Sequence, residues 1–374
     1  MYKPIGNYGL IGDMNSAALV GIDGCIDWCC FPRFDSPSVF AAVLDHQRGG
    51  RFQIAPEGPI DEVRQTYLPN TNILSTRFRT PTGELTLTDF MPLSGDESFS
   101  DCPHEIHRIV RCSGGTVTVR CIFQPRMDYG RTETTLTAVN GSVKARGGHQ
   151  NLTLCSQVPL EIDGDEASAE FTLHQGEEVA FVAAYGHGRP WRIETYRTAE
   201  KLQQTKVYWE VMASGLNYDG MWKEEVIRSF LVLHLMVYRP TGAVIAAPTT
   251  SLPETIGGSR NWDYRFAWLR DSSFAMDILY RMGHMEEADR YLRWLTYQCK
   301  VTNGKPKILY GISPASSVKE VELDHLEGYE GSGPVRIGNG ASRHFQLDVF
   351  GGVIRGVDSL QKNGGGVTDE AWSL

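Results

Sequence analysis

The chain has 374 residues, of which 41% are hydrophobic and 22% charged, a balance typical of a globular protein with a large core. Acidic residues outnumber basic ones, 45 to 36, and the formal net charge is −9. That charge argues against a nucleic acid or an anionic membrane as the main partner. No apolar run approaches the ~20 residues of a membrane span, and the first residues show no apolar signal segment, so we expect a cytoplasmic protein.

Residues 1–190 are predicted to form one domain of antiparallel β structure. Short stretches of alternating polarity recur between turn signals, without helical patterns between them. Asn140-Gly141 is typical of a type I′ hairpin turn, which needs positive φ at both residues. Many strands at this spacing favour a large antiparallel β-sandwich. Turns are predicted at Pro81-Thr82-Gly83, Ser113-Gly114-Gly115, Asn140-Gly141, Asp163-Gly164-Asp165 and Gln175-Gly176.

The pattern changes near residue 190, and the rest of the chain is predicted to be helical. Residues 191–218 contain a linker helix rich in Glu, Lys, Gln and Ala, and residues 219–374 form the second domain. Its first helix is predicted to be capped by Asp219 and to run to Val237. The other helices are predicted over 271–282, 285–299 and 342–361, with a long, glycine-rich loop over 301–340.

The chain has eight cysteines, which we expect to be reduced thiols in a protein of this size without a signal segment. Two spacings invite a metal interpretation, Cys25-x3-Cys29-Cys30 and Cys102-x-His104-x2-His107. Neither has the paired C-x2-C halves of a structural zinc site. We therefore expect no metal and no cofactor.

The densest group of functional side chains lies at residues 260–271, just before a predicted helix. It combines three arginines, two aspartates and four aromatic residues. Aromatic faces pack on sugar rings, and carboxylates and guanidinium groups bond hydroxyls, so the mixture suits a neutral polyhydroxylated ligand. The alternative is a buried, ion-paired loop with its tryptophans in the core. Asp271 alone would also suit the N-cap of a helix.

A second group lies at residues 328–339, at the end of the long loop. Its glycines would let the backbone approach a ligand closely, although a plain turn-rich connection explains them as well. The spacing is not that of a phosphate-binding loop.

These segments resemble the signature of glycoside hydrolase family 15, which contains glucoamylases, glucodextranases and microbial trehalases. The resemblance rests on residues 257–265, on Trp268-Leu269-Arg270-Asp271, and on 334–339 followed by 346–349. Residues 5–13 and 32–38 are similar to the trehalase-like N-terminal domain of the bacterial members. The resemblance implies an N-terminal antiparallel β-sandwich (a super-sandwich) followed by an (α/α)6 barrel. It also implies inverting exo-hydrolysis of an α-glucosidic bond, with trehalose or an α-glucan end as substrate.

The family's motifs imply a set of sugar-binding residues and a second set behind them. Arg270 and Asp271 would hold hydroxyls of the terminal glucose, and Trp268 would form an apolar wall. Gly352 departs from the family pattern, which has a glutamate at this place. The substrate-binding set is Tyr264, Trp268, Arg270, Asp271, Arg336 and Asn339, and the supporting set is Trp262, Asp263, Gln346 and Asp348.

The resemblance does not supply the two catalytic glutamates. An inverting enzyme needs a general acid and a general base, and the family's blocks that carry them have no counterpart here. Residues 368–372 suit the start of a further helix. Twelve helices with short loops need roughly 190 residues, more than lie between 219 and 374, so we expect a partial barrel. The acid and base are expected beyond Leu374. The alternative is a non-catalytic sugar-binding or structural remnant.

Overall fold

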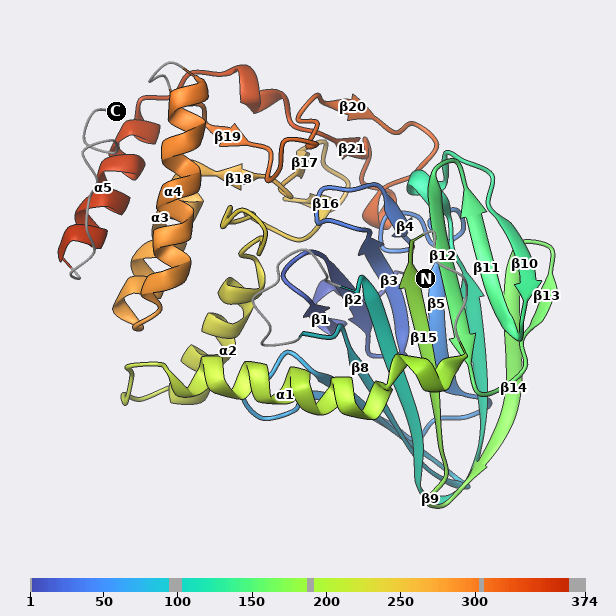
Figure 1. Cartoon of the computed structure of the whole chain (residues 1–374). Coiled ribbons are helices and arrows are strands. Elements are labelled where there is room, and N and C mark those ends of the chain that lie inside the picture. Colours follow the sequence, from blue (N-terminus) through green and yellow to red (C-terminus); the bar gives the residue numbers. More distant parts are fainter. Residues whose placement is uncertain (1, 94–102, 187–191, 303–305, 363–374) are drawn as a thin grey trace. The chain divides into compact units, whose positions relative to one another are not determined.

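The computed structural model describes residues 2–93, 103–186, 192–302 and 306–362 (Figure 1). The chain divides into two compact units, Met1–Trp209 and Glu210–Leu374. The division falls inside helix α1 (Thr198–Ser214), within the segment that the sequence assigned to a linker helix. The predicted helix start at 368–372 lies outside the described residues.

The first unit is built on a large antiparallel sheet of fifteen strands, as the sequence predicts for this part of the chain. The long strand β9 (Glu105–Gln124) joins two sets of strands. Its first half pairs with β8 and β15, and its second half with β5 and β14. The other strands are β1 (Tyr8–Gly12), β2 (Ala17–Gly21), β3 (Cys25–Cys30), β4 (Ser38–Phe40), β5 (Arg51–Pro56), β6 (Glu62–Tyr67), β7 (Leu74–Thr80), β8 (Gly83–Phe90), β10 (Thr135–Val139), β11 (Ser142–Gly147), β12 (Gln150–Ser156), β13 (Glu161–Asp163), β14 (Glu166–His174) and β15 (Glu178–Tyr185).

Most of the predicted hairpins are confirmed, and one predicted turn is wrong. Asn140 and Gly141 both have positive φ, 53° and 80°, between β10 and β11. The Ser113-Gly114-Gly115 turn does not exist, because β9 runs straight through it. Its partner β8 pairs Leu85 with Cys112 but Glu84 with Gly114, so Ser113 is the extra residue of a β-bulge.

The core of the first unit surrounds a buried charge on β9. The Arg108 guanidinium contacts the Asp89 carboxylate at 2.7 Å, and both side chains are fully buried. It also donates to the carbonyl oxygens of Phe52 and Gly24, each at 2.6 Å, and lies over the Phe52 ring. These bonds satisfy a cation that would otherwise be very costly to bury, and they tie three strands together.

Helix α1 begins on the face of β9. Thr198 Oγ1 lies 3.0 Å from the His107 ring, and Lys201 Nζ lies 2.5 Å from the Glu105 carboxylate. Burial lowers the pKa of His107, against the opposing effect of Glu105. The predicted linker helix is therefore present, although it follows a separate 3-10 turn, η3 (Ile193–Tyr196).

The second unit contains four further helices within the described residues, joined by long segments with short strand pairs. The helices are α2 (Lys223–Leu235), α3 (Leu269–Arg281), α4 (Met285–Val301) and α5 (Asp348–Lys362). Two local predictions are wrong. Asp219 does not cap α2 but contacts the Lys223 ammonium in solvent, and the last helix begins at 348 because η5 (Gly340–Arg343) ends first. The strands are β16 (Thr250–Pro253), β17 (Asn261–Asp263), β18 (Ala267–Trp268), β19 (Leu309–Tyr310), β20 (Val321–Glu322) and β21 (Arg336–Ile337).

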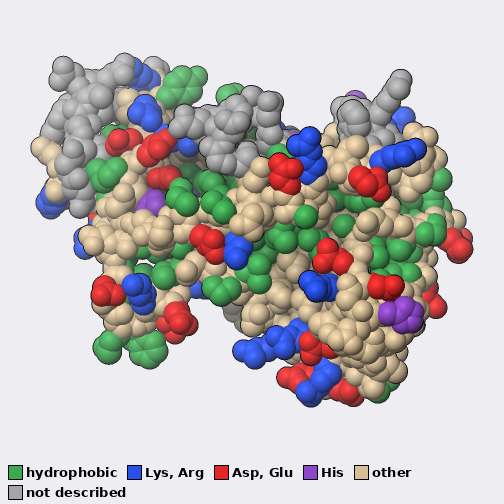
Figure 2. Space-filling model, turned by 60° about the horizontal axis from the view of Figure 1, so that its bottom comes forward, with side chains coloured by type: hydrophobic (Ala, Val, Ile, Leu, Met, Phe, Trp, Pro, Cys, Tyr) green, Lys and Arg blue, Asp and Glu red, His purple; other side chains and the backbone are tan. Residues whose placement is uncertain are grey.

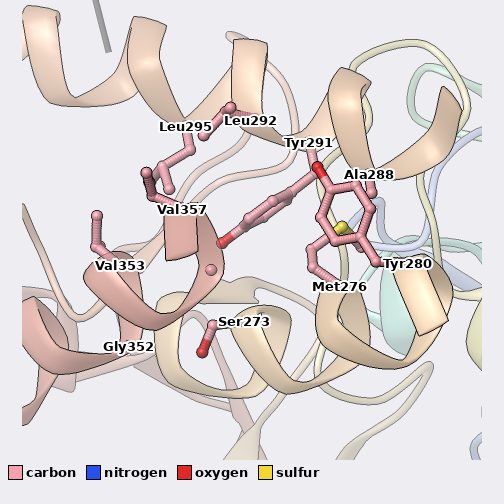
Figure 3. A pocket seen from close by; sticks show the side chains of 11 residues that line it. Ser273, Met276, Tyr280, Ala288, Tyr291, Leu292, Leu295, Gly352, Val353 and Val357 are labelled. Atoms are coloured by element: carbon pink, nitrogen blue, oxygen red, sulfur yellow. The ribbon is translucent and has the colours of Figure 1, made fainter. Parts of the chain in front are cut away.

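Helices α3, α4 and α5 pack together around a small apolar cavity (Figure 3). The cavity measures about 10 Å³, less than a water molecule needs, and Tyr291, Met276 and Leu295 line it with Gly352. A Cβ at Gly352 would lie 3.3 Å from Ser273 Oγ and 3.4 Å from Arg270 Cα. Gly352 therefore lets α5 approach the first turn of α3, which carries Arg270 and Asp271.

Charges of both signs are interspersed on the face of the molecule that Figure 2 shows, without an extended field of one sign. In the described part of the chain, no helix is long and apolar enough to cross a membrane.

Candidate functional site

The two segments singled out in the sequence meet in the second unit. The Asp263 carboxylate, at the end of β17, accepts a hydrogen bond of 3.0 Å from the backbone N–H of Gly338. The Asn339 side chain donates to the backbone carbonyl of Asp263 at 3.0 Å, and the Asn261 side chain donates to the carbonyl of Ser332 at 2.9 Å. These three bonds join residues more than 70 positions apart.

A buried ion pair fixes the same junction. The Arg265 guanidinium bonds the Asp263 carboxylate through two nitrogens, at 2.6 and 2.9 Å, and both side chains are fully buried. A two-pronged pair of this kind fixes orientation as well as distance. Asp263 therefore holds the two segments together through buried bonds to both.

Next to this junction lies an open cleft of about 450 Å³. Aromatic and charged side chains share its wall, as a sugar site requires. The lining residues are Glu254, Arg260, Trp262, Tyr264, Trp268, Glu320, Asn339, Gly340, Ala341 and His344.

Tyr264 and Trp268 form one side of the cleft. Their ring centroids lie 5.9 Å apart, at an angle of 47°. Burial raises the pKa of Tyr264, and the negative charges of Glu254 and Asp271 add to the rise. Among the described residues, no hydrogen-bond partner is found for the buried indole N–H of Trp268. The cleft therefore has an aromatic wall with a neutral phenol and an indole donor next to it.

Arg336 belongs to the protein's own scaffold at this cleft. Its guanidinium lies 4.6 Å from the centre of the Trp262 ring and 3.0 Å from the Glu322 carboxylate. It also lies 3.7 Å from Glu320 and donates to the carbonyl of Ser259 at 2.9 Å. These contacts hold the Trp262 ring in place and engage the guanidinium with groups of the chain itself.

Asn339 lines the cleft but is likewise engaged. Its side-chain N–H₂ donates to Asp263, and its oxygen accepts from the backbone N–H of Ala341, which caps η5. Both ends of the amide are thus used within the chain.

Arg270 and Asp271 lie in the first turn of α3, where they meet Asp348 of α5. The Arg270 guanidinium is 3.5 Å from Asp271 and 3.8 Å from Asp348, and all three side chains are about half exposed. Asp271 is not the N-cap, a position that Trp268 occupies. These residues do not line the cleft itself, but their charges act on the pKa of Tyr264, which does line it.

Sequence reasoning missed several cleft residues. Glu254 and Glu320 bring carboxylates to its wall, and His344 adds an imidazole. Each lies in a segment without a local motif, so no local signal marks these residues. Gln346, predicted to stand on a helix, lies before α5 and is exposed.

One group of side chains could hold a metal ion in the described part of the chain. It consists of His234, His284 and Glu287, and none of these three residues lines the cleft. Seven cysteines, all but Cys102, are described, and they are free and buried.

Comparisons with known proteins agree with this division of the chain. Residues 2–209 match the family described as "Trehalase-like, N-terminal", and residues 220–374 match "Glycosyl hydrolases family 15". The trehalases of Thermoplasma volcanium and Thermoplasma acidophilum are 36% and 37% identical, over 100% and 95% of this chain. A trehalase of Mycolicibacterium smegmatis is 35% identical over 100% of it. The chain spans about 60% of the length of these relatives.

Proposed function

The chain belongs to glycoside hydrolase family 15, and from that premise we propose that its cleft holds a terminal glucose of an α-linked sugar for inverting hydrolysis. Trehalose is the proposed substrate, because the relatives that match across the chain are trehalases. The observation that carries the proposal is the cleft of about 450 Å³ whose wall combines Tyr264, Trp262 and Trp268 with charged side chains.

Each feature of the cleft has a use in sugar recognition. The faces of Tyr264 and Trp268 suit the C–H face of a glucose ring, which is apolar. The Arg270–Asp271 pair, which stands outside the lining of the cleft, would supply a fork of donors beside a carboxylate. A glucose held in this way presents hydroxyls to all of these groups.

Arg336 and Asn339 are proposed as positioning residues and not as direct ligands. Their polar atoms are committed to Glu322, Asp263 and neighbouring backbone groups. Through these bonds they fix the Trp262 ring and the floor of the cleft.

The general acid and base are not assigned to the cleft carboxylates. Glu254 lies 2.7 Å from the Arg260 guanidinium, and Glu320 lies 3.7 Å from that of Arg336 while accepting from Gly340 N–H at 2.8 Å. Both carboxylates are therefore engaged by groups of the chain itself. We propose that both glutamates belong to the part of the relatives' length that the chain does not span.

The finer architecture follows the same proposal. The two strand sets joined by β9 would be the layers of a super-sandwich, and α2 to α5 would be helices of an (α/α)6 barrel. A single core cluster that draws on strands of both sets supports the first part.

A second candidate is a sugar-binding protein without catalysis, which the lack of an assignable acid–base pair favours. The two are separated by measuring binding and hydrolysis on the same sample. Residues 1–374 are expected to bind trehalose, followed by tryptophan fluorescence, and to release no glucose from trehalose or maltooligosaccharides. Glucose release that Asp271→Ala abolishes would show that the chain holds its own acid and base.

The measurement of trehalose binding has a matched control variant on helix α3. Arg270→Ala is expected to weaken trehalose binding at least about tenfold, because hydroxyls lose their partner in a site built to bond them. Arg281→Ala, in the last turn of the same helix and in an ion pair with the largely buried Asp277, is expected to leave binding unchanged. Equal affinities for the two variants would refute the sugar-binding role of Arg270.

A further inference from the structure

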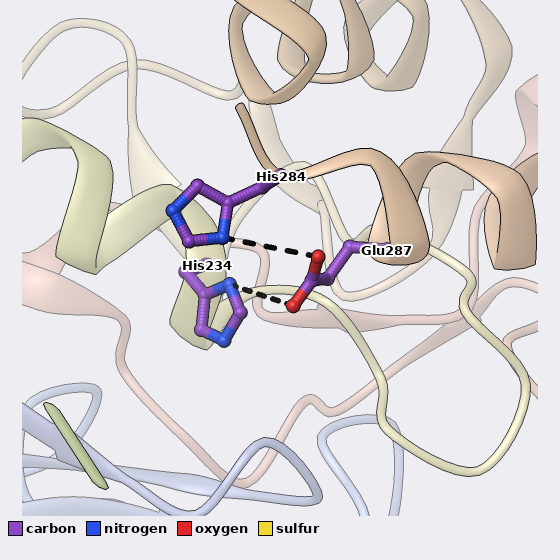
Figure 4. A group of neighbouring side chains, drawn as sticks. All are labelled: His234, His284 and Glu287. Atoms are coloured by element: carbon purple, nitrogen blue, oxygen red, sulfur yellow. Dashed lines mark ion pairs between the residues drawn. The ribbon is translucent and has the colours of Figure 1, made fainter. Parts of the chain in front are cut away.

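A compact group of two histidines and a glutamate lies in the second unit, outside the lining of the cleft. His234 comes from the last turn of α2, His284 immediately precedes α4, and Glu287 stands in the first turn of α4 (Figure 4). Their ligating atoms all lie within 4.8 Å of one another. Both imidazoles turn their Nδ1 atoms toward the same carboxylate, at 3.8 Å from His234 and 3.9 Å from His284.

Neither distance is that of a hydrogen bond. Burial lowers the pKa of His234 to about 3, and the His284 ring and the guanidinium groups of Arg239 and Arg290 add to the effect. Burial also lowers the pKa of His284, against the opposing effect of Glu287. The two imidazoles thus face the Glu287 carboxylate without a hydrogen bond to it.

The geometry suits a small divalent ion. Ligand atoms bonded to one Zn²⁺ at about 2.0–2.1 Å stand roughly 3–4 Å apart, so the two nitrogen–oxygen distances already fit. The widest separation, at most 4.8 Å, needs less than about 1 Å of closure. Two imidazoles and one carboxylate leave a fourth position for water or another ligand.

The surroundings hold the rings as a metal site requires. The buried Phe230 ring packs against both imidazoles, with centroids 5.7 Å from His234 and 4.4 Å from His284. On the far side of the His284 ring, Nε2 and the Met212 carbonyl oxygen both lie next to Gly215. Among the described residues no hydrogen-bond partner is found for this Nε2 atom, and Nδ1 on the other side of the ring faces Glu287.

Access and charge also permit an ion. His234 is fully buried, but the side chains of His284 and Glu287 are 10% and 16% exposed, which gives a route from solvent. The positive groups nearby are Arg239 and Arg290, and the Arg290 guanidinium is directed to the Arg239 carbonyl. Their charges weaken cation binding, so the site favours ions that bind imidazole strongly over Mg²⁺ or Ca²⁺.

We propose that His234, His284 and Glu287 form a site for a divalent transition metal of the Zn²⁺ class, with two imidazole ligands and one carboxylate. The site joins the end of α2 to the start of α4. A bound ion would therefore stabilise the second unit directly, whether or not the cleft binds sugar.

The test is a titration of the whole chain with Co²⁺, followed by visible absorption, and with Zn²⁺, followed by the unfolding temperature. We expect one equivalent of Co²⁺ to give the intense bands of a four- or five-coordinate ion, and Zn²⁺ to raise the unfolding temperature. Glu287→Gln should weaken binding at least tenfold, and so should His284→Gln. The matched control is Glu286→Gln, which removes the same charge from the exposed neighbouring position.

Each outcome decides the proposal. Loss of binding in Glu287→Gln and His284→Gln, with both variants folded by circular dichroism and Glu286→Gln unaffected, supports it. The proposal is overturned if the unaltered chain shows no saturable Co²⁺ spectrum, or if Glu287→Gln binds as tightly as Glu286→Gln. A thiolate-to-cobalt charge-transfer band would assign the ion to a cysteine and overturn it as well. Trehalose binding is a separate readout, so failure of the sugar proposal leaves this result unchanged.

Discussion

Replacing Asp263 by alanine should remove the bond that holds the two motif segments together. The carboxylate takes two hydrogen bonds from the Arg265 guanidinium, at 2.6 and 2.9 Å, one of 3.1 Å from the Arg265 backbone N–H and one of 3.0 Å from the Gly338 N–H. Alanine removes the counter-ion of a fully buried guanidinium, which costs about 3–5 kcal/mol, and the acceptor of two backbone N–H groups, which costs about 1–3 kcal/mol for each group left unsatisfied. Because the terms are not additive, we expect a loss of about 4–6 kcal/mol.

A loss of that size is a large part of the ~5–15 kcal/mol that stabilises a typical domain. The second unit of Asp263→Ala should therefore be largely open at 37 °C, and trehalose binding should be lost with it. The assay is urea unfolding with peptide-resolved hydrogen exchange, in which the strands of the first unit serve as the internal reference. Exchange should accelerate at 261–268 and 336–340 and stay unchanged along β9.

The control is the other acid–arginine pair at the same cleft. Glu254 and Arg260 lie 2.7 Å apart, but their side chains are 43% and 72% exposed. An exposed pair contributes at most about 1 kcal/mol, so Glu254→Ala should change the unfolding free energy by no more than that. The two variants remove the same chemical group and differ in burial. If their unfolding free energies agree within about 0.5 kcal/mol, the reasoning from burial is refuted.

Two further predictions concern the backbone and the pH dependence. Gly338→Ala should lower the free energy of unfolding by more than Gly257→Ala, which should lower it by only about 1–2 kcal/mol. Both glycines have positive φ, but a Cβ at Gly338 would overlap a backbone carbonyl, whereas a Cβ at Gly257 meets nothing within 4 Å. Urea unfolding of the two variants measures the difference. His107, whose ring lies 2.8 Å from the Glu105 carboxylate that Lys201 also contacts, has a lowered pKa, so the unfolded chain binds the extra proton. Stability of the first unit should therefore fall below pH ~6.5, by up to about 1.4 kcal/mol for each pH unit, and should fall less steeply in His107→Gln.

The sequence predicted those parts of the fold that local chemistry decides. The Asn140-Gly141 turn follows from the φ values that the two residues tolerate, and the helix over 271–282 from its apolar spacing. The predicted turn at Ser113-Gly114-Gly115 failed because pairing with β8 outweighs the local signal of two glycines. Asp219 failed as a cap because the chain turns into α2 only at Trp222, which has positive φ.

At the site, the sequence predicts which residue types are present, but not which of their side chains are buried and which line the cleft. The segment 260–271 is in part a buried ion-paired loop and in part a cleft wall. Asp263 and Arg265 form the buried ion pair, while Tyr264 and Trp268 line the open cleft. Alternation along β17 and the turn after it sends neighbouring residues in opposite directions. A linear motif does not show which direction each takes.

Two short strand pairs bring the carboxylates of Glu254 and Glu320 to the cleft. Glu254 follows β16, which pairs with β17, and Glu320 precedes β20, which pairs with β21. The two short strand pairs thus deliver one acid each to a cleft whose aromatic wall is delivered by β17 and β18. In both cases an arginine from the motif segments, Arg260 or Arg336, lies next to the acid. Paired charges and aromatic rings in one wall suit the neutral sugar that we propose as the ligand.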